Sequence, residues 1–330
     1  MSRNTAITTI VAAAVLAFSG SVLAGFGPAP FMEWVTVGDP GNANDTHGAG
    51  YGGVDYVYII ARHEVTNAQY CEFLNAVAAA DPKGLYNTSM GSGYGGITRS
   101  GSSGSYTYST ITGRGNMPVN YVSWYDALRF GNWMHNGQPT GAEDASTTED
   151  GAYDMSLGSA VVRKAGARVF LTSEDEWYKA AYYKGGGTSA GYWDYPTQSD
   201  TAPTDEGPTG TDFTNGSANH GSAVGDLTHV GSYTAKPSDS PYGTFDQGGN
   251  VWEWNEALIS STSRGVRGGP FNDSNDSMSV SYRGATDPTN EHNSIGFRVA
   301  GVLLLDGDGD GDVDLEDFAL FQAMFTGPLP

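Results

Sequence analysis

The stretch Tyr242–Trp254 places two adjacent glycines just before an alternating Trp-Glu-Trp triplet. The glycines allow a tight reversal of the chain, because glycine adopts backbone conformations closed to other residues. The triplet alternates as in a strand, so its two indoles point to one face and Glu253 to the other. The spacing alone is compatible with a hairpin that has buried tryptophans and a solvated Glu253. The oxygen-bearing side chains of Asp246, Asn250 and Glu253 around the turn also suit a hard cation such as calcium.

Five sequence blocks occur in a fixed order along the chain. They are Glu64–Tyr70, Pro118–Ala127, Arg168–Trp177, Gly249–Trp254 and Gly296–Arg298. Together they resemble the formylglycine-generating enzyme, or sulfatase-modifying factor, superfamily over most of residues 31–301. The resemblance implies an α+β fold similar to C-type lectins, irregular, with few helices and short strands.

The same resemblance implies two calcium sites in the main domain. The first site would use side-chain oxygens of Asn219 and Asp226. The second would use Asp246, Glu253 and the backbone carbonyls of Gly249 and Val251. Both sets supply the oxygen ligands that calcium prefers.

Enzymes of this superfamily hold copper between two cysteine thiolates, the soft ligands that Cu(I) selects. Here the matching positions are Asp273 and Ser279, and the only cysteine of the chain is Cys71. We therefore expect no copper and no catalytic residue at these positions. Cys71 lies beside the apolar stripe of a predicted helix and is expected to be a buried, unreactive thiol.

Residues 1–24 have the pattern of a secretory signal, with an apolar run and a cleavage site near Ala24. We expect residues 25–302 to form the main domain and the protein to be secreted, periplasmic or held at the cell surface. No other stretch is long and apolar enough to span a membrane. The formal net charge of −21 argues against a nucleic-acid partner, which needs clustered basic residues.

Three helices are predicted from their start signals and apolar periodicity. The first begins after Thr66 and continues to Asn75 or slightly further. Ser123 and Ser173 each begin a Ser-x-x-acid capping box that opens a later helix. Strands are expected at 33–37 and 54–60, where apolar and β-branched residues alternate. Residues 84–116, which are mostly Gly, Ser, Thr and Tyr, predict a long surface excursion with short strands. Residues 185–245 contain few apolar residues and would be disordered unless tied down.

Residues 303–330 form a distinct acidic segment. Loop positions 1, 3, 5, 7, 9 and 12 carry carboxylates, at Asp306, Asp308, Asp310, Asp312, Asp314 and Asp317. A glycine at position 6 completes the arrangement of an EF-hand-like calcium loop. The terminal aspartate resembles a dockerin repeat, although dockerins normally have two such loops. Phe318, Phe321 and Phe325 predict a short amphipathic helix; the alternative is a solvated acidic tail.

Two classes of function follow from these patterns. The first is a calcium-stabilised binding or surface-assembly module without oxidase activity, whose partner is a peptide, a glycan or a cohesin-like protein. Aromatic residues in the loops, among them Tyr108 and Tyr192, would stack on such a ligand. The second is a sulfatase-modifying oxidoreductase, or another oxidase, that uses a divergent site. The sequence favours the first class.

Overall fold

A four-stranded antiparallel sheet joins segments from both ends of the main domain in the computed structural model, which describes residues 31–46, 50–186 and 191–302. Its order is β1 (Trp34–Val37), β2 (Tyr58–Ala61), β12 (Val299–Val302) and β5 (Val169–Leu171). The strand predicted at 33–37 is confirmed. The strand predicted at 54–60 begins only at Tyr58, so the prediction was wrong for the first four of those residues.

The second four-stranded sheet carries the Trp-Glu-Trp triplet. Its order is β10 (Gly284–Thr286), β9 (Ser263–Arg267), β8 (Trp252–Ser260) and β11 (Ile295–Phe297). Strands β8 and β11 run parallel, with Trp252 opposite Ile295. The parallel pairing places the Gly296–Arg298 block directly beside the Gly249–Trp254 block.

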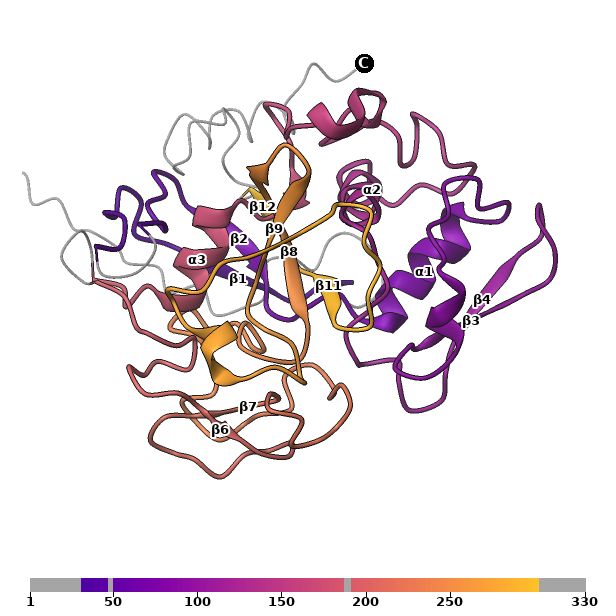
Figure 1. Ribbon diagram of the computed structural model, residues 1–330. Coiled ribbons are helices and arrows are strands. Elements are labelled where there is room, and N and C mark those ends of the chain that lie inside the picture. Colours follow the sequence, from indigo (N-terminus) through magenta and orange to yellow (C-terminus); the bar gives the residue numbers. More distant parts are fainter. Residues whose placement is uncertain (1–30, 47–49, 187–190, 303–330) are drawn as a thin grey trace, which may run out of the picture. The chain divides into compact units, whose positions relative to one another are not determined.

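The three predicted helices are confirmed, and each begins with a complete capping box. They are α1 (Asn67–Val77), α2 (Trp124–His135) and α3 (Glu174–Tyr182). In each box the hydroxyl of the N-cap residue accepts a hydrogen bond from the backbone amide of the third helical residue. The side chain of that third residue in turn accepts from the backbone amide of the N-cap residue. Figure 1 shows α3 on one side of β8 and β9, with α1 and α2 on the other.

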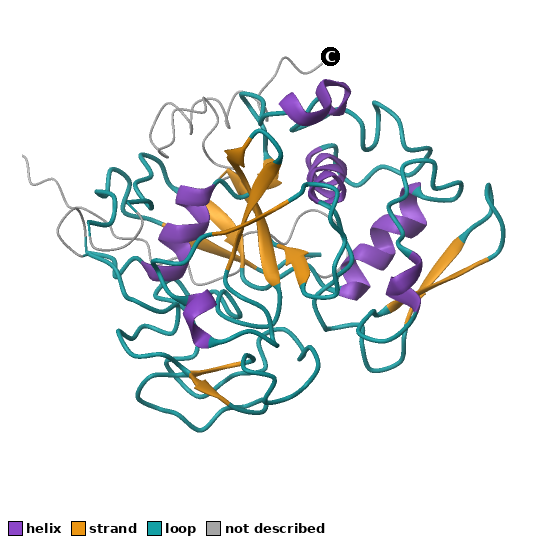
Figure 2. Cartoon of the chain, in the orientation of Figure 1, coloured by secondary structure: helices purple, strands orange, loops and turns teal. Residues whose placement is uncertain are grey.

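Short elements interrupt the loops, which make up most of the described chain (Figure 2). These are η1 (Thr88–Gly91), β3 (Ile97–Ser100), β4 (Thr107–Thr110), η2 (Met155–Ala160), β6 (Thr204–Asp205), β7 (Ser217–Ala218) and η3 (Asn275–Met278). Strands β3 and β4 pair as an antiparallel ribbon, and β6 and β7 as a parallel pair. The fold is thus mixed α+β with few helices and short strands.

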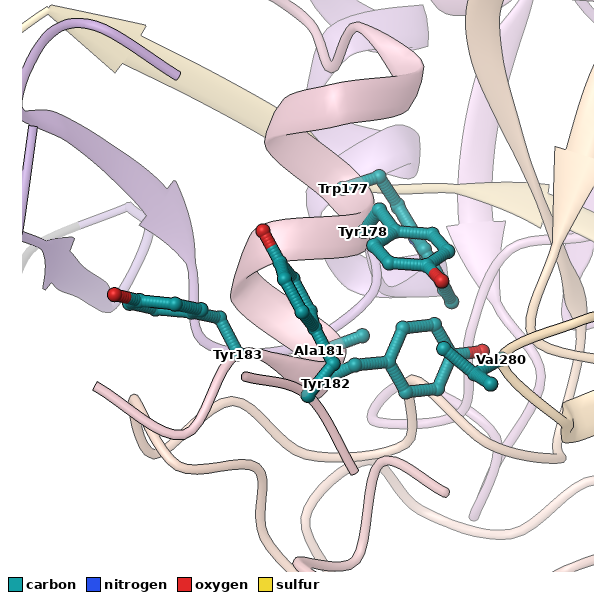
Figure 3. Close-up of a cluster of buried hydrophobic side chains, with 7 residues drawn as sticks. Trp177, Tyr178, Ala181, Tyr182, Tyr183 and Val280 are labelled. Atoms are coloured by element: carbon teal, nitrogen blue, oxygen red, sulfur yellow. The ribbon is translucent and has the colours of Figure 1, made fainter. Parts of the chain in front are cut away.

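The core is rich in aromatic side chains. One cluster gathers around α3 and contains Trp177, Tyr178, Tyr182 and Val280 (Figure 3). The rings of Tyr178 and Tyr182 meet edge to face with centroids 4.9 Å apart, a geometry that contributes about 0.5–1.5 kcal/mol beyond simple burial. These contacts, with the hydrogen bond from the Tyr182 hydroxyl to the Met278 backbone oxygen at 3.0 Å, fix the second half of α3 against the loop that follows β9.

The described residues from Glu33 onward belong to one compact unit, and Phe31 and Met32 to another. Within the described part of the chain, no helix combines the length and apolar character that crossing a bilayer requires. The predicted signal segment 1–24 and the acidic segment 303–330 lie outside the described residues.

Candidate functional site

The turn before β8 requires glycine at position 249. Gly249 has a φ of +90°, and a Cβ there would lie 2.3 Å from the backbone oxygen of Asn219. The backbone amide of Asn250 donates to that same oxygen at 2.9 Å. The turn therefore holds the Asn219 segment against the start of β8, although the two stretches are distant in sequence.

The residues predicted for the first calcium site, Asn219 and Asp226, are neighbours. The Asn219 Nδ2 donates to the backbone oxygen of Asp226 at 2.9 Å. The buried Asn219 Oδ1 has no hydrogen-bond partner in the described part of the chain. The Asp226 carboxylate, in contrast, accepts from both terminal nitrogens of Arg114 at 2.9 and 3.0 Å. The amide oxygen of Asn219 fits a calcium ligand, whereas Asp226 would have to share its carboxylate with Arg114.

Glu253, predicted as a ligand of the second calcium site, is fully buried and paired. Its Oε1 accepts from the Arg298 Nη2 at 2.8 Å, and its Oε2 from the Trp177 indole at 2.7 Å. The Arg298 Nε donates to Oε2 as well, at 3.0 Å. Both carboxylate oxygens are thus engaged, so the Glu253 side chain does not fit a calcium ligand here. The alternative interpretation of Glu253 as solvated is wrong, since its exposure is 0%.

Asp246 lies in the same buried region as Glu253. Its Oδ2 accepts from the backbone amide of Gly231 at 2.6 Å. Burial raises the pKa of Asp246 to about 6, and the nearby Glu253 charge adds to the effect while Arg298 opposes it. Asp246 and the carbonyls of Gly249 and Val251 remain the members of the predicted second set that are compatible with calcium.

Arg298 also holds two other segments in place. It donates to the backbone oxygens of Ala61 and Phe245 at 2.8 and 2.7 Å. Nearby Glu64 accepts from the Asn250 amide at 3.1 Å, and burial raises its pKa well above the usual value. This hydrogen-bonded cluster brings together four of the five sequence blocks, those that contain Glu64, Trp177, Glu253 and Arg298.

No three His, Cys, Asp or Glu side chains among residues 31–46, 50–186 and 191–302 are grouped so as to hold a metal ion. Any calcium in this part of the chain would therefore depend on amide and backbone oxygens as well as carboxylates. The predicted ligands Asp306–Asp317 lie outside the described residues.

The positions that match the superfamily's cysteine pair carry no thiol. Asp273 is exposed and Ser279 is half-buried, on either side of η3. The only thiol, Cys71, is buried on α1, where the Asn75 side chain lies 3.6 Å from its sulfur and burial raises its pKa. A high pKa and burial make a thiol a poor nucleophile and a poor metal ligand. A copper–dithiolate centre therefore does not fit this chain.

Ser279 instead lines an open cleft of about 380 Å³. The cleft lies between the 194–200 loop and the 276–281 segment. The two are joined by a hydrogen bond from the backbone amide of Val280 to the backbone oxygen of Asp194, at 2.8 Å. Its lining residues are Asp194, Tyr195, Asp200, Asp276, Ser279, Val280 and Ser281. The lining contains three carboxylates and no basic side chain; Lys184 approaches Asp200 from outside at 3.9 Å. Such a lining favours a ligand with a positive charge and hydrogen-bond donors.

The loop tyrosines do not all act as predicted. Tyr108 and Tyr192 are buried, with exposures of 4% and 3%. The Tyr192 hydroxyl donates to the backbone oxygen of Ala43 at 2.8 Å and accepts from Asn42 at 2.7 Å. These two rings are part of the scaffold, so the prediction that they stack on a ligand was wrong. Tyr195 lines the cleft and is partly exposed, but it was not among the aromatic residues predicted to contact a ligand.

Comparisons with known proteins agree with this architecture. A family model described as "Sulfatase-modifying factor enzyme 1-like domain" matches residues 54–302. The solved structure of Treponema denticola variable protein 1 is 20% identical, with a TM-score of 0.51, and the match covers 82% of this chain and 95% of that one.

Two further structures are similar at comparable identity. They are CarF, at 20% identity, coverage of 82% and 98% and a TM-score of 0.49, and PvdO from Pseudomonas aeruginosa, at 19%, 82% and 92% and 0.47. No curated protein matches the chain. At 20% identity, the likeness to the Treponema protein concerns the fold alone.

Proposed function

The chain belongs to the family of sulfatase-modifying factor enzyme 1-like domains, and on that premise we propose that it is a secreted, calcium-stabilised member that binds a ligand instead of oxidising one. The observation that carries the proposal is the cleft beside Ser279. Ser279 occupies the position that matches one family cysteine, yet the cleft that it lines carries carboxylates and hydroxyls. The chain has one cysteine, so it has no cysteine pair.

The chemistry of the cleft supports binding of a cationic group, such as a lysine or arginine side chain of a peptide. Asp200 and Asp276 are exposed at its rim, where they attract a positive charge without the desolvation cost of a buried pair. Tyr195 and Val280 supply an apolar wall for the aliphatic part of such a side chain. A cohesin-like or glycan partner would need a different surface.

Calcium enters the proposal as a structural ion. Asn219 Oδ1 would hold one ion, with Asp226 joining after it releases Arg114, and Asp246 with the carbonyls of Gly249 and Val251 would hold a second. The predicted loop Asp306–Asp317 would bind a further ion. Calcium would neutralise part of an excess of 21 negative charges and tie down the glycine-rich loops, which bury few apolar side chains of their own.

The test of the proposal is a reaction with a Cys-x-Pro-x-Arg peptide in the presence of copper and oxygen. We expect the peptide thiol to remain intact while the peptide binds through its arginine. An active family member with its cysteine pair serves as the positive control. Formation of an aldehyde by this chain would contradict the proposal and favour an oxidase with a divergent site.

Metal content is measured separately by native mass spectrometry after exposure to calcium and to copper. We expect calcium to be retained and copper to be lost on desalting. Cleavage of the signal is checked by the mass of the exported protein, which should begin near Gly25. A tightly held copper ion with no calcium would contradict the calcium part of the proposal.

A further inference from the structure

An exposed apolar face lies beside strands β8 and β9. Three large aliphatic side chains form it: Leu157, Val162 and Leu258, with exposures of 50%, 67% and 61%. Isolated exposed apolar residues are common on protein surfaces, but neighbouring ones indicate a contact site. We refer to Leu157, Val162 and Leu258 as the apolar face.

Arg264 shows that these three side chains are neighbours. Its Nη2 donates to the backbone oxygens of Ser159 and Val161 at 2.9 and 3.4 Å, which ties it to the segment carrying Leu157 and Val162. Arg264 is also the direct cross-strand partner of Leu258 on β8, and directly opposed residues share one face of a sheet.

One member of the apolar face, Val162, borders a cleft of about 150 Å³. Val162 lines it together with Arg264 and Trp124, whose ring lies 3.9 Å below the Arg264 guanidinium carbon. The cleft is large enough for part of one apolar side chain. Its floor is held in place by buried and paired groups, so it is formed before any occupant arrives.

The described chain ends within reach of this face. The amide of Val302, the last described residue, donates to the backbone oxygen of Arg168 at 3.1 Å. Arg168 is six residues after Val162, so the two lie within about 21 Å even if the chain between them is fully extended. Residues 303–317 could span up to about 50 Å, which is more than sufficient to bring Phe318 to the apolar face.

Charge complementarity identifies the occupant. Lys164 and Arg168 are both exposed; the backbone oxygen of Arg168 accepts from Val302, and Lys164 is paired with Asp150 at the surface. Only 16 of the 330 residues are Lys or Arg, and three of them fall within 163–168. The segment that follows carries seven carboxylates between positions 306 and 317, and then the helical Phe318, Phe321 and Phe325 pattern. We infer that residues 303–330 fold back onto this face, with the phenylalanines on Val162 and Leu258 and the carboxylates beside Lys164 and Arg168.

Zero-length carbodiimide cross-linking of the full-length protein tests the inference, because it joins only amines and carboxylates in contact. An equal mixture of ordinary and ¹⁵N-labelled protein, in calcium buffer, separates links within one chain from links between chains. We expect Lys164 to be joined to a carboxylate of 306–317 in the same chain. The link between Lys164 and its ion-pair partner Asp150 serves as an internal reference, and Lys83 and Lys236 serve as control amines.

A double variant, Val162→Ser with Leu258→Ser, should lower the yield of the Lys164–tail link at least fivefold. Phe213→Ser is the matched control, because Phe213 is 75% exposed and lies outside the apolar face; its yield should stay unchanged. Circular dichroism confirms that each variant is folded. Three results would overturn the inference: no Lys164–tail link, links only between chains, or a link that the double variant leaves intact.

Discussion

The carboxylates inside this molecule and those in its cleft differ in what surrounds them. Glu253, Glu174 and Glu176 are buried, and each accepts hydrogen bonds from at least one arginine. Asp200 and Asp276 are exposed at the rim of the cleft, whose lining contains no arginine or lysine. The inner carboxylates are therefore structural groups held by arginines, whereas those at the rim of the cleft are exposed to solvent, where Asp200 accepts from the Asp194 amide at 3.2 Å and lies 3.9 Å from Lys184.

The comparison explains why the family is evident from sequence while the activity is not. All three inner glutamates lie in the sequence blocks that carry the resemblance. Glu253 pairs with Arg298 of the last block, and Glu174 with Arg267 and Arg283. These residues specify the scaffold. The cleft is built from loops between the blocks, and it is there that this chain differs from the oxidases it resembles.

Glu253→Ala should cause the largest loss of stability. A small loss would contradict the distinction between buried, arginine-paired carboxylates and exposed ones. The substitution removes the carboxylate that accepts the hydrogen bonds of the fully buried Arg298, which costs about 3–5 kcal/mol of unfolding free energy. Urea denaturation measures the change. Glu33→Ala is the control, since its ion pair with Arg62 is long (3.6 Å) and exposed; it should cost less than about 1 kcal/mol.

Glu174→Gln should destabilise less, by about 2–3 kcal/mol. Glutamine keeps one acceptor oxygen for Arg267, and Arg267 also donates to the backbone oxygen of Val280. Arg283→Gln is the matched variant on the more exposed side of the same cluster and should cost about 1 kcal/mol. Equal losses of unfolding free energy for Glu174→Gln and Arg283→Gln would show that burial of the charged group does not determine the loss.

A buried carboxylate without a close arginine sharpens the comparison. Asp126 caps α2, and its nearest cation, Arg129, is 3.9 Å away. Burial raises the pKa of Asp126 from 3.8 to about 7. Its protonated form is thus favoured by folding, so its contribution is complete below about pH 4 and is lost as the pH rises through about 7. The slope is at most about 1.4 kcal/mol for each pH unit.

Asp126→Asn should remove that part of the pH dependence of the unfolding free energy between pH 4 and 7. Glu176 should behave oppositely, because Arg163 lowers its pKa in spite of burial; its contribution is lost as the pH falls. Denaturation series on the Asp126→Asn and Glu176→Gln variants check the two signs. A wild-type slope unchanged in the Asp126→Asn variant would refute the assignment to Asp126.

The smallest change in stability is expected in the cleft. Asp200→Asn and Asp276→Asn should alter the unfolding free energy by less than about 0.5 kcal/mol. Each should weaken binding of an arginine-containing peptide about 2- to 5-fold, as expected for one exposed charge. Isothermal titration calorimetry measures the affinity, with Glu72→Gln on α1 as the control for lost charge. A stable variant with undiminished affinity would exclude the cleft as the binding site.

Local chemistry made much of the fold predictable. Ser123 and Ser173 open helices because each finds its capping partner three residues later in the chain. The partner of Glu253 lies 45 residues away, and nothing near Glu253 in sequence indicates an arginine. The cleft could not be predicted either, because it depends on how two loops approach each other. The Gly296–Arg298 block was the one signal that could have identified Arg298 as a partner.

Strand β12 has a consequence for how the chain is made. It lies between β2 and β5, so the last strand of the domain fills an interior place in the first sheet. During synthesis, β2 has no neighbour on that side until Val299–Val302 emerges. Pairing between segments so distant in sequence is slow. The first sheet should therefore be completed only after residues 299–302 have been synthesised, and chains interrupted before residue 299 should remain unfolded.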